Sequence, residues 1–208
     1  HECSSAASDV YKRQDGSRMA IGAGWNDGNG SSAGHVRVYE WDDLAFDWFQ
    51  LGLDIDGEDV DDQSGYSVSL SSDGSRMAIG AIGNDGNGSN AGHVRVYEWD
   101  GIGWVQLGLD IDGEDADDLS GYSVSLSSDG NRLAIGAIAI YGAGGDAGDV
   151  RVFDWDSVSL SWVQLGLAID GEAAGDGSGG SVSLSSDGNR LAIGCLLYTS
   201  DAADEHSC

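Results

Sequence analysis

The stretch SVSLSSDGSRMAIGA, residues 67–81, decides the fold of this 208-residue chain. It holds two runs in which apolar residues alternate with polar or small ones, as in a β-strand. Between the runs stands Ser-Asp-Gly, and Asp and Gly both tolerate the backbone of a tight turn. The stretch therefore predicts a β-hairpin.

The second half of this hairpin returns along the chain, as DGSRMAIGA or DGNRLAIG. A second segment, AGHVRVYEWD, occupies residues 33–42 and 91–100 and returns as AGDVRVFDWD at 147–156. Repetition at a fixed period is typical of solenoids and propellers. The first segment begins at Asp15, Asp73, Asp129 and Asp187, so the period is 56 or 58 residues.

Each period contains four β-like runs, which in the second copy are residues 67–71, 76–81, 94–99 and 104–111. Four antiparallel strands in a period of roughly 40 to 60 residues are typical of a β-propeller blade. We therefore predict an all-β fold with about three four-stranded antiparallel blades of an incomplete β-propeller. The alternative is a two-sheet sandwich, which would leave one face of each strand in water.

The two ends of the chain differ from the repeat. SSAASDVYKRQ and CLLYTSDAADE can be encoded by opposite strands of one DNA sequence, which resembles a transposase-type sequencing adapter. We therefore predict that both ends are adapter-derived and non-native, and that the first is disordered; the alternative is two unrelated native tails. The predicted boundaries are 1–14 and 195–208 for the ends and 15–72, 73–128, 129–186 and 187–194 for the repeats.

The chain is strongly acidic, with a formal charge of −27. Nucleic acid and anionic membrane surfaces repel a polyanion, so we expect no nucleic-acid partner. We also expect no membrane insertion, because no run of about 18 apolar residues is present. Cys3, Cys195 and Cys208 lie in or beside the predicted adapter ends, so they indicate neither a disulfide framework nor a metal site.

The string GYSVSLSSDGNRLAIGA at residues 121–137, followed by AGDVRVFDWD, resembles the FG-GAP repeat of integrin-type propellers. The resemblance covers nearly all of residues 15–194. It implies a propeller of about seven blades that is extracellular or in the bacterial envelope and binds partners. Integrin-type repeats often carry a calcium loop between the first two strands of a blade. Here that turn holds one carboxylate, such as Asp73, which cannot supply the roughly six to eight oxygens that calcium takes.

Other loops of the repeat concentrate acidic residues. NDGNG stands at residues 26–30 and 84–88, and DIDGED begins the loops at 54–62 and 110–118. Antiparallel order places both kinds of loop at one end of every blade. Clustered carboxylates invite a divalent cation, with calcium as the candidate; the alternative is a solvated acidic rim. The candidate metal ligands are Asp27, Asp54, Asp56, Glu58, Asp85, Asp110, Asp112 and Glu114.

Arginines and tryptophans recur at fixed repeat positions. We expect each arginine to pack beside an aromatic ring or pair with a carboxylate, the alternative being a ladder of anion contacts. Tryptophan pairs such as Trp99 and Trp104 are expected to clasp the outer hairpin. Trp25 has no counterpart in the other copies and is the candidate for a ligand contact. His35 and His93 become Asp149 in the third copy, which argues against a catalytic role.

These features favour a non-catalytic binding or scaffolding module of an extracellular or envelope propeller. Its partners would be a protein or a glycan, with further blades of the same chain beside it. One alternative is the propeller part of a secreted polysaccharide hydrolase, with Asp and Glu from the 54–62 and 110–118 loops as its acids. The acidic residues repeat almost identically from copy to copy, whereas an active site is usually a single asymmetric arrangement, which argues against the hydrolase. The other alternative is a structural spacer of a surface protein.

Overall fold

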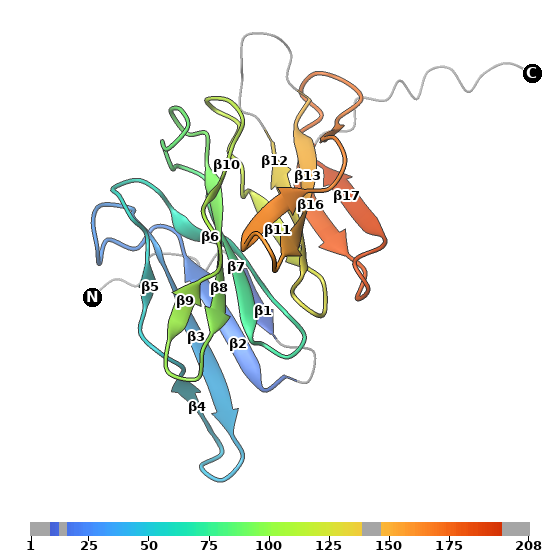
Figure 1. Cartoon of the computed structure of the whole chain (residues 1–208). Coiled ribbons are helices and arrows are strands. Elements are labelled where there is room, and N and C mark those ends of the chain that lie inside the picture. Colours follow the sequence, from blue (N-terminus) through green and yellow to red (C-terminus); the bar gives the residue numbers. More distant parts are fainter. Residues whose placement is uncertain (1–8, 13–15, 139–146, 197–208) are drawn as a thin grey trace, which may run out of the picture.

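The computed structural model describes residues 9–12, 16–138 and 147–196, and the regular elements of this part of the chain are all β-strands. They form four sheets that follow one another in sequence order and lie side by side (Figure 1). The all-β prediction is therefore confirmed. The described part of the chain has no helix long and apolar enough to span a membrane.

The first sheet, blade 1, runs in the order β1-β2-β3-β4, with β5 pairing with β3. Its first strand falls in residues 1–14, for which the sequence predicted disorder, yet its backbone pairs with β2 and places Asp9 opposite Gly22. The adapter origin of this end stays a prediction. The strands are β1 (Asp9–Lys12), β2 (Arg18–Ala23), β3 (His35–Asp42), β4 (Asp47–Gln50) and β5 (Ile55–Asp56).

Blades 2 and 3 repeat this plan, and two strands of a fourth sheet follow them. Blade 2 consists of β6 (Ser64–Leu70), β7 (Arg76–Ala81), β8 (His93–Trp99), β9 (Trp104–Gln106) and β10 (Ile111–Asp112). Blade 3 consists of β11 (Ser123–Leu126), β12 (Arg132–Ala137), β13 (Asp149–Asp156), β14 (Ser161–Gln164) and β15 (Ile169–Asp170). The fourth sheet pairs β16 (Ser178–Leu184) with β17 (Leu191–Cys195). These sheets are blades of a propeller, and they do not close into a ring.

The outermost strand of each blade is split, whereas the sequence predicted one run over 104–111. In blade 2, β9 and β10 both pair with β8, and Gly108 between them has a φ of 85°. This left-handed conformation, which suits glycine, interrupts the alternation of side chains. Leu109 is consequently 84% exposed and Ile111 only 7%, although strict alternation would put them on one face.

The apolar core lies between the blades. One cluster packs Val36 of blade 1 against Met77 and Ile79 of blade 2, and the next packs Val94 of blade 2 against Leu133 of blade 3. The central strands are therefore buried on both faces, and the two-sheet sandwich is wrong. Burial of each such side chain contributes about 1.5–3 kcal/mol, so stacking between blades is a main source of stability.

Small residues allow the blades to approach closely. A Cβ atom on Gly80 would lie 2.1 Å from the carbonyl oxygen of Gly121 in the next blade, a distance at which atoms overlap. The Ser67 hydroxyl donates a hydrogen bond to that same carbonyl at 2.6 Å. The glycine of Ala-Ile-Gly-Ala is thus required by the neighbouring blade.

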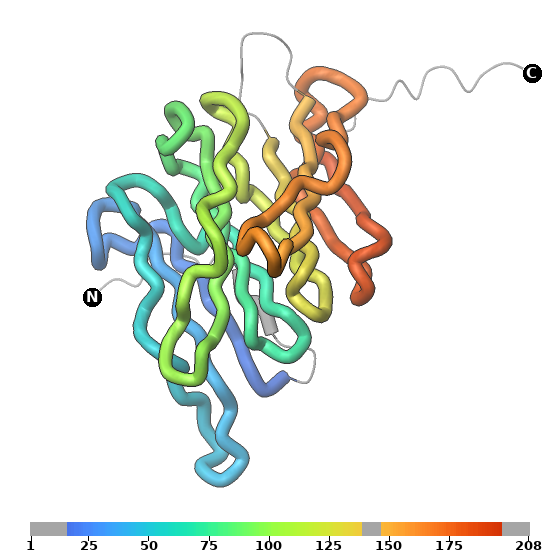
Figure 2. The backbone as a smooth tube through the Cα atoms, viewed as in Figure 1, coloured from blue at the N-terminus to red at the C-terminus, as the bar shows by residue number. Residues whose placement is uncertain are grey.

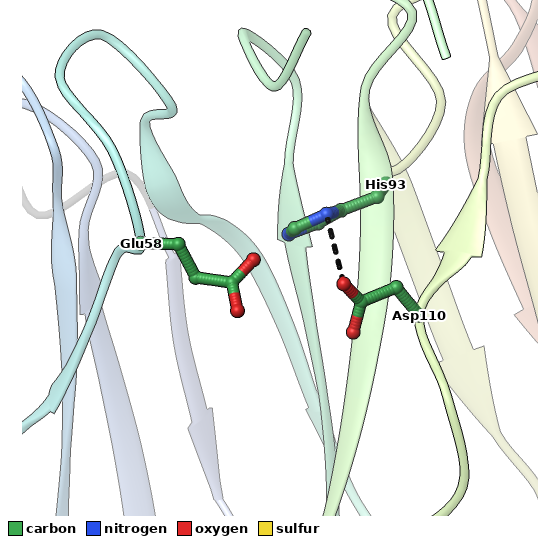
Figure 3. Close-up of side chains that lie close together, drawn as sticks. All are labelled: Glu58, His93 and Asp110. Atoms are coloured by element: carbon green, nitrogen blue, oxygen red, sulfur yellow. Dashed lines mark ion pairs between the residues drawn. The ribbon is translucent and has the colours of Figure 1, made fainter. Parts of the chain in front are cut away.

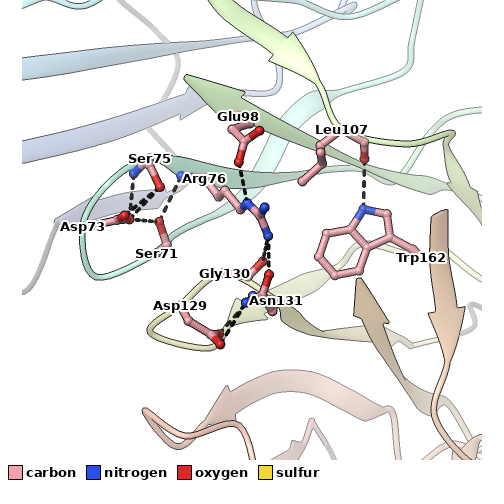
Figure 4. A network of polar contacts seen from close by, with 10 residues as sticks. All are labelled: Ser71, Asp73, Ser75, Arg76, Glu98, Leu107, Asp129, Gly130, Asn131 and Trp162. Carbon is pink, nitrogen blue, oxygen red and sulfur yellow. Dashed lines mark hydrogen bonds and ion pairs between the residues drawn. The ribbon is translucent and has the colours of Figure 1, made fainter. Parts of the chain in front are cut away.

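Arginine and tryptophan side chains add polar contacts between blades (Figure 4). Arg76 Nε donates to Glu98 Oε1 at 3.0 Å within blade 2, and its Nη1 donates to the carbonyl of Gly130 in blade 3 at 3.3 Å. Trp162 Nε1 donates to the carbonyl of Leu107 at 3.0 Å, from blade 3 to blade 2. The pairing expected for the repeat arginines is therefore confirmed.

The tryptophan pairs clasp the outer hairpins as predicted. The ring centroids of Trp99 and Trp104 lie 5.5 Å apart, and the equivalent pairs in blades 1 and 3 have the same separation. At the opposite edge, Asp73 Oδ1 accepts hydrogen bonds from Ser71 Oγ and Ser75 N in the turn between β6 and β7. The carboxylate of this turn therefore stabilises the turn itself.

Candidate metal centre

The long acidic loops gather at one end of the blades, which we call the loop end. Figure 2 shows the loops at residues 57–63, 83–92 and 113–119 at this end, with the short turns at 43–46 and 72–75 at the other. The arrangement predicted from antiparallel order is confirmed.

Between blades 1 and 2 the loop end contains an open cavity of about 490 Å³, which we call the acidic pocket. Residues from the loop after β5, from the loop after β7 and from around β10 line it. Most are carboxylates, so the pocket attracts cations and hydrogen-bond donors. The lining consists of Glu58, Asp59, Val60, Asp62, Asn84, Asp85, Gly86, Asp110 and Asp112.

Three side chains converge at this pocket, and two of them, Glu58 and Asp110, line it. One ligand atom each of Glu58, His93 and Asp110 lies within 4.8 Å of the other two. His93 Nδ1 is 3.9 Å from Asp110 Oδ2, and the imidazole reaches between the two carboxylates (Figure 3). His93 is only 1% exposed, and its Nε2 has no hydrogen-bond partner among the described residues.

The strand pairing brings these residues together. His93 is the first residue of β8 and pairs with Asp112 of β10, so Asp110 lies just before the paired segment. Glu58 follows β5, in the loop that leads from blade 1 into blade 2. The three side chains therefore come from two blades.

A buried arginine borders the cluster. Arg95 Nη1 lies 3.3 Å from Glu58 Oε1, and Nη2 donates to the carbonyl of Asp56 at 2.9 Å. Burial lowers the pKa of His93, and the charge of Arg95 lowers it further, against the opposing effect of Asp110 and Glu58. The imidazole is consequently neutral near pH 7 and offers a nitrogen lone pair.

The other predicted ligands have different surroundings. Arg37 binds Asp54 through Nε and Nη2, the shortest contact being 2.7 Å, and with Gln50 holds the pKa of Asp54 at about 2. Asp27 Oδ1 accepts a hydrogen bond from Ser32 N at 2.8 Å. Asp85 and Asp112 line the acidic pocket, whereas Asp56 and Glu114 do not. Trp25 is 54% exposed.

Sequence reasoning missed the place of His93 in this cluster. The exchange of His35 and His93 for Asp149 argued against a role, and the candidate ligands were all carboxylates. A signal was nevertheless present, since His93 starts a strand directly after an acidic loop. Antiparallel pairing places that strand start beside the DIDG segment.

The junction between blades 2 and 3 has a different set of residues. Asp149 takes the place of His93, Glu114 that of Glu58, and Ala168 that of Asp110. Burial raises the pKa of Asp149 to about 6, with Glu114, Asp118 and Asp170 adding to the rise and Arg151 opposing it. Its Oδ2 is buried without a hydrogen-bond partner among the described residues.

The segment that contributes Glu58 and His93 also matches a known family. Residues 53–97 match the FG-GAP repeat family. This segment is therefore similar to an FG-GAP repeat. It runs from just before β5 into β8, so it carries two of the three converging side chains. Among curated protein sequences, none matches this chain.

Solved structures support the propeller fold around the FG-GAP repeat. The chain is similar to an assigned 6-phosphogluconolactonase from Bacteroides uniformis, with a TM-score of 0.59 and 14% identity over 89% of this chain and 46% of that one. A second assigned 6-phosphogluconolactonase, from Bacteroides fragilis, gives 0.54 and 12% over 89% and 41%. The WD40 repeats of RRP9 give 0.52 and 13% over 89% and 44%. The chain spans less than half the length of each, and these low identities show the fold alone.

Proposed function

We propose that this chain is a non-catalytic binding or scaffolding module of an extracellular or envelope β-propeller protein. Its loop end would contact a protein or a glycan. The observation that carries the proposal is the acidic pocket, an open cavity that loops of two blades form together. Loops held by a rigid scaffold are a common place for recognition, and the FG-GAP repeat supports the extracellular setting.

The charge of the pocket narrows the class of partner. Its carboxylates favour hydrogen-bond donors and positive charge, which glycan hydroxyls and basic protein surfaces provide. Trp25, exposed in the loop after β2, offers a flat apolar surface at the same end of blade 1. An aromatic ring of this kind suits stacking on a sugar or packing against a protein side chain.

Charge also separates this chain from the two assigned lactonases. Their names specify a phosphorylated lactone, which is an anion. A pocket lined with six carboxylates repels such a substrate. The acidic lining therefore supports the non-catalytic proposal over a lactonase function for the acidic pocket.

The test is binding of the full chain to a glycan array and to a library of displayed extracellular protein fragments. A loop-end double variant, Asp85→Asn with Asp112→Asn, should lose any ligand found. The matched control, Asp43→Asn with Asp47→Asn, changes the same charge at the opposite end and should retain it. Hydrolysis of a lactone or glycan by the chain would contradict the proposal, and no binding in either library would favour the spacer.

A further inference from the structure

We propose that Glu58, His93 and Asp110 bind a divalent transition metal ion of the zinc class between blades 1 and 2. The inference concerns the ion alone and does not depend on the protein or glycan partner proposed above. It rests on the convergence of the three side chains and on the unpartnered imidazole nitrogen.

The geometry suits a single small ion. Zinc bonds to histidine nitrogen and to carboxylate oxygen are about 2.0–2.2 Å long, so the ligand atoms stand roughly 3 to 4 Å apart. The three atoms lie within 4.8 Å of one another, so small side-chain rotations complete the set. The Glu58 side chain is 44% exposed and that of Asp110 33%. Asp110 Oδ1 accepts a hydrogen bond from Gln106 Nε2 at 2.6 Å, which leaves Oδ2 facing the imidazole.

The buried imidazole is the observation that acids alone would not provide. His93 is almost fully buried, and its Nε2 has no hydrogen-bond partner in the described part of the chain. Buried nitrogen atoms in folded proteins nearly always have a partner, because an unpaired one is unfavourable. A metal bond to the imidazole would give its nitrogen a partner and would fix the orientation of the ring (Figure 3).

The donor set favours zinc over calcium. One imidazole with two carboxylates is a usual set for zinc and related ions, whereas calcium takes about six to eight oxygen ligands. The ion proposed for these three residues is therefore a transition metal, and calcium binding by the other predicted ligands stays a prediction. The open side of the acidic pocket leaves a further coordination position for water.

Arg95 is the group that competes with the ion. Its Nη1 contacts Oε1 of Glu58 at 3.3 Å, which leaves Oε2 for the metal. The positive charge of Arg95 opposes a cation nearby, but Asp59, Asp62 and Asp112 on the same pocket offset it. The guanidinium also keeps its hydrogen bond to the Asp56 carbonyl when it shares Glu58.

Neighbouring junctions provide matched controls within the chain. Between blades 2 and 3, Ala168 supplies no ligand and Asp149 replaces the imidazole, so Glu114 stands without the complete set. In blade 1, Asp54 at the position of Asp110 is held by Arg37. One complete set is therefore present among the described residues.

The experiment is a titration of the full chain with Zn²⁺ in competition with a chromophoric chelator. The cysteines are first alkylated, because thiolates bind zinc. We expect the chain to bind one Zn²⁺ ion. Asp110→Asn and Glu58→Gln should each weaken its affinity by at least about tenfold, while Glu114→Gln leaves the affinity unchanged. His93→Asp, which copies Asp149, should abolish the preference for zinc over calcium.

The spectrum of bound Co²⁺ identifies the ligands independently. We expect ligand-field bands that persist after alkylation and disappear in Asp110→Asn, with circular dichroism confirming that each variant is folded. Equal affinity in all variants would overturn the proposal. So would equal binding of calcium and zinc, or a cobalt spectrum that alkylation removes completely.

Discussion

Blades 2 and 3 share the contacts of their strands and differ at the loop end. Arg76 and Arg132 each pair with an acid of their own blade and donate to a backbone carbonyl of the next blade. At the loop end, by contrast, His93 is replaced by Asp149. The repeat therefore preserves what stacks the blades, and its departures mark where one junction acquires a property that the next lacks.

Blades 1 and 2 also differ at a position where the repeat keeps the same residue. Arg37 and Arg95 are equivalent in the repeat, yet Arg37 is held by Asp54 of its own blade, whereas Arg95 reaches Asp56 and Glu58 of the preceding segment. Arg37 is half-exposed and Arg95 is buried. A side chain in this fold is thus defined by its neighbouring blade as much as by its own.

The largest effect is expected from filling the gap between blades. Gly80→Ala should destabilise the fold by about 3 kcal/mol, because its Cβ would overlap the carbonyl of Gly121. The control Gly103→Ala, with no atom within 4 Å, should change little. Urea unfolding of both variants measures the difference, and equal stability would contradict the stacking described here.

A smaller change in stability is expected from the arginines, and it should be larger for an arginine that joins two blades than for one that pairs within its own blade. Arg76→Met should cost about 1.5–3 kcal/mol, since the guanidinium joins two blades through charge-assisted hydrogen bonds. Arg37→Met should cost less than about 1 kcal/mol, because its ion pair with Asp54 is solvent-exposed. Chemical unfolding of the two variants should give this order; the reverse order would show that the inter-blade bonds contribute little.

The pH dependence of stability should distinguish Asp149 from Asp54. The pKa of Asp149 is raised from 3.8 to about 6. Its contribution to the free energy of unfolding is therefore full below about pH 4 and is lost as pH rises through 6. Asp149→Asn should therefore match the parent near pH 4 and exceed it by about 1–2 kcal/mol at pH 7, allowing for solvent screening.

Asp54 should affect the stability with the opposite dependence on pH. Its pKa is lowered to about 2, so its contribution is present above about pH 4 and is lost as pH falls toward 2. Asp54→Asn should consequently be less stable than the parent at pH 7, with the gap closing in acid. Melting curves from pH 3 to pH 7 test both variants, and parallel profiles would contradict the assigned surroundings.

The smallest effect concerns the repeated serine bridge. Ser67 and Ser123 donate from Oγ to the carbonyls of Gly121 and Gly179 in the next sheets, at 2.6 and 2.8 Å. Ser67→Ala and Ser123→Ala should each cost about 0.5–1.5 kcal/mol. Similar losses in urea unfolding would support equivalence of the two junctions, whereas a loss confined to one would break it.

Local patterns were sufficient for the hairpin, the blade and the loop end. Alternation in residues 67–81 and the turn at Asp73 act within one blade, so the sequence contains their cause. Alternation failed over 104–111, because Gly108 adopts a left-handed φ that a two-residue period does not anticipate.

The candidate site was harder to predict, because its residues come from different blades. Glu58 approaches His93 only through the angle between blades 1 and 2, which no pattern within a repeat encodes. Clusters of carboxylates were visible in the sequence, yet most of them cap loops or pair with arginines. The buried imidazole distinguishes one cluster from the rest, and burial is a property of the assembled blades.

The most direct test of metal binding between blades 1 and 2 is to follow the NMR signals of the imidazole nitrogens during Zn²⁺ addition. We expect the signals of the His93 nitrogens to shift and to saturate at one equivalent of Zn²⁺, while those of His35 keep their positions. Unchanged His93 signals, or His35 and His93 moving together only in excess metal, would contradict it.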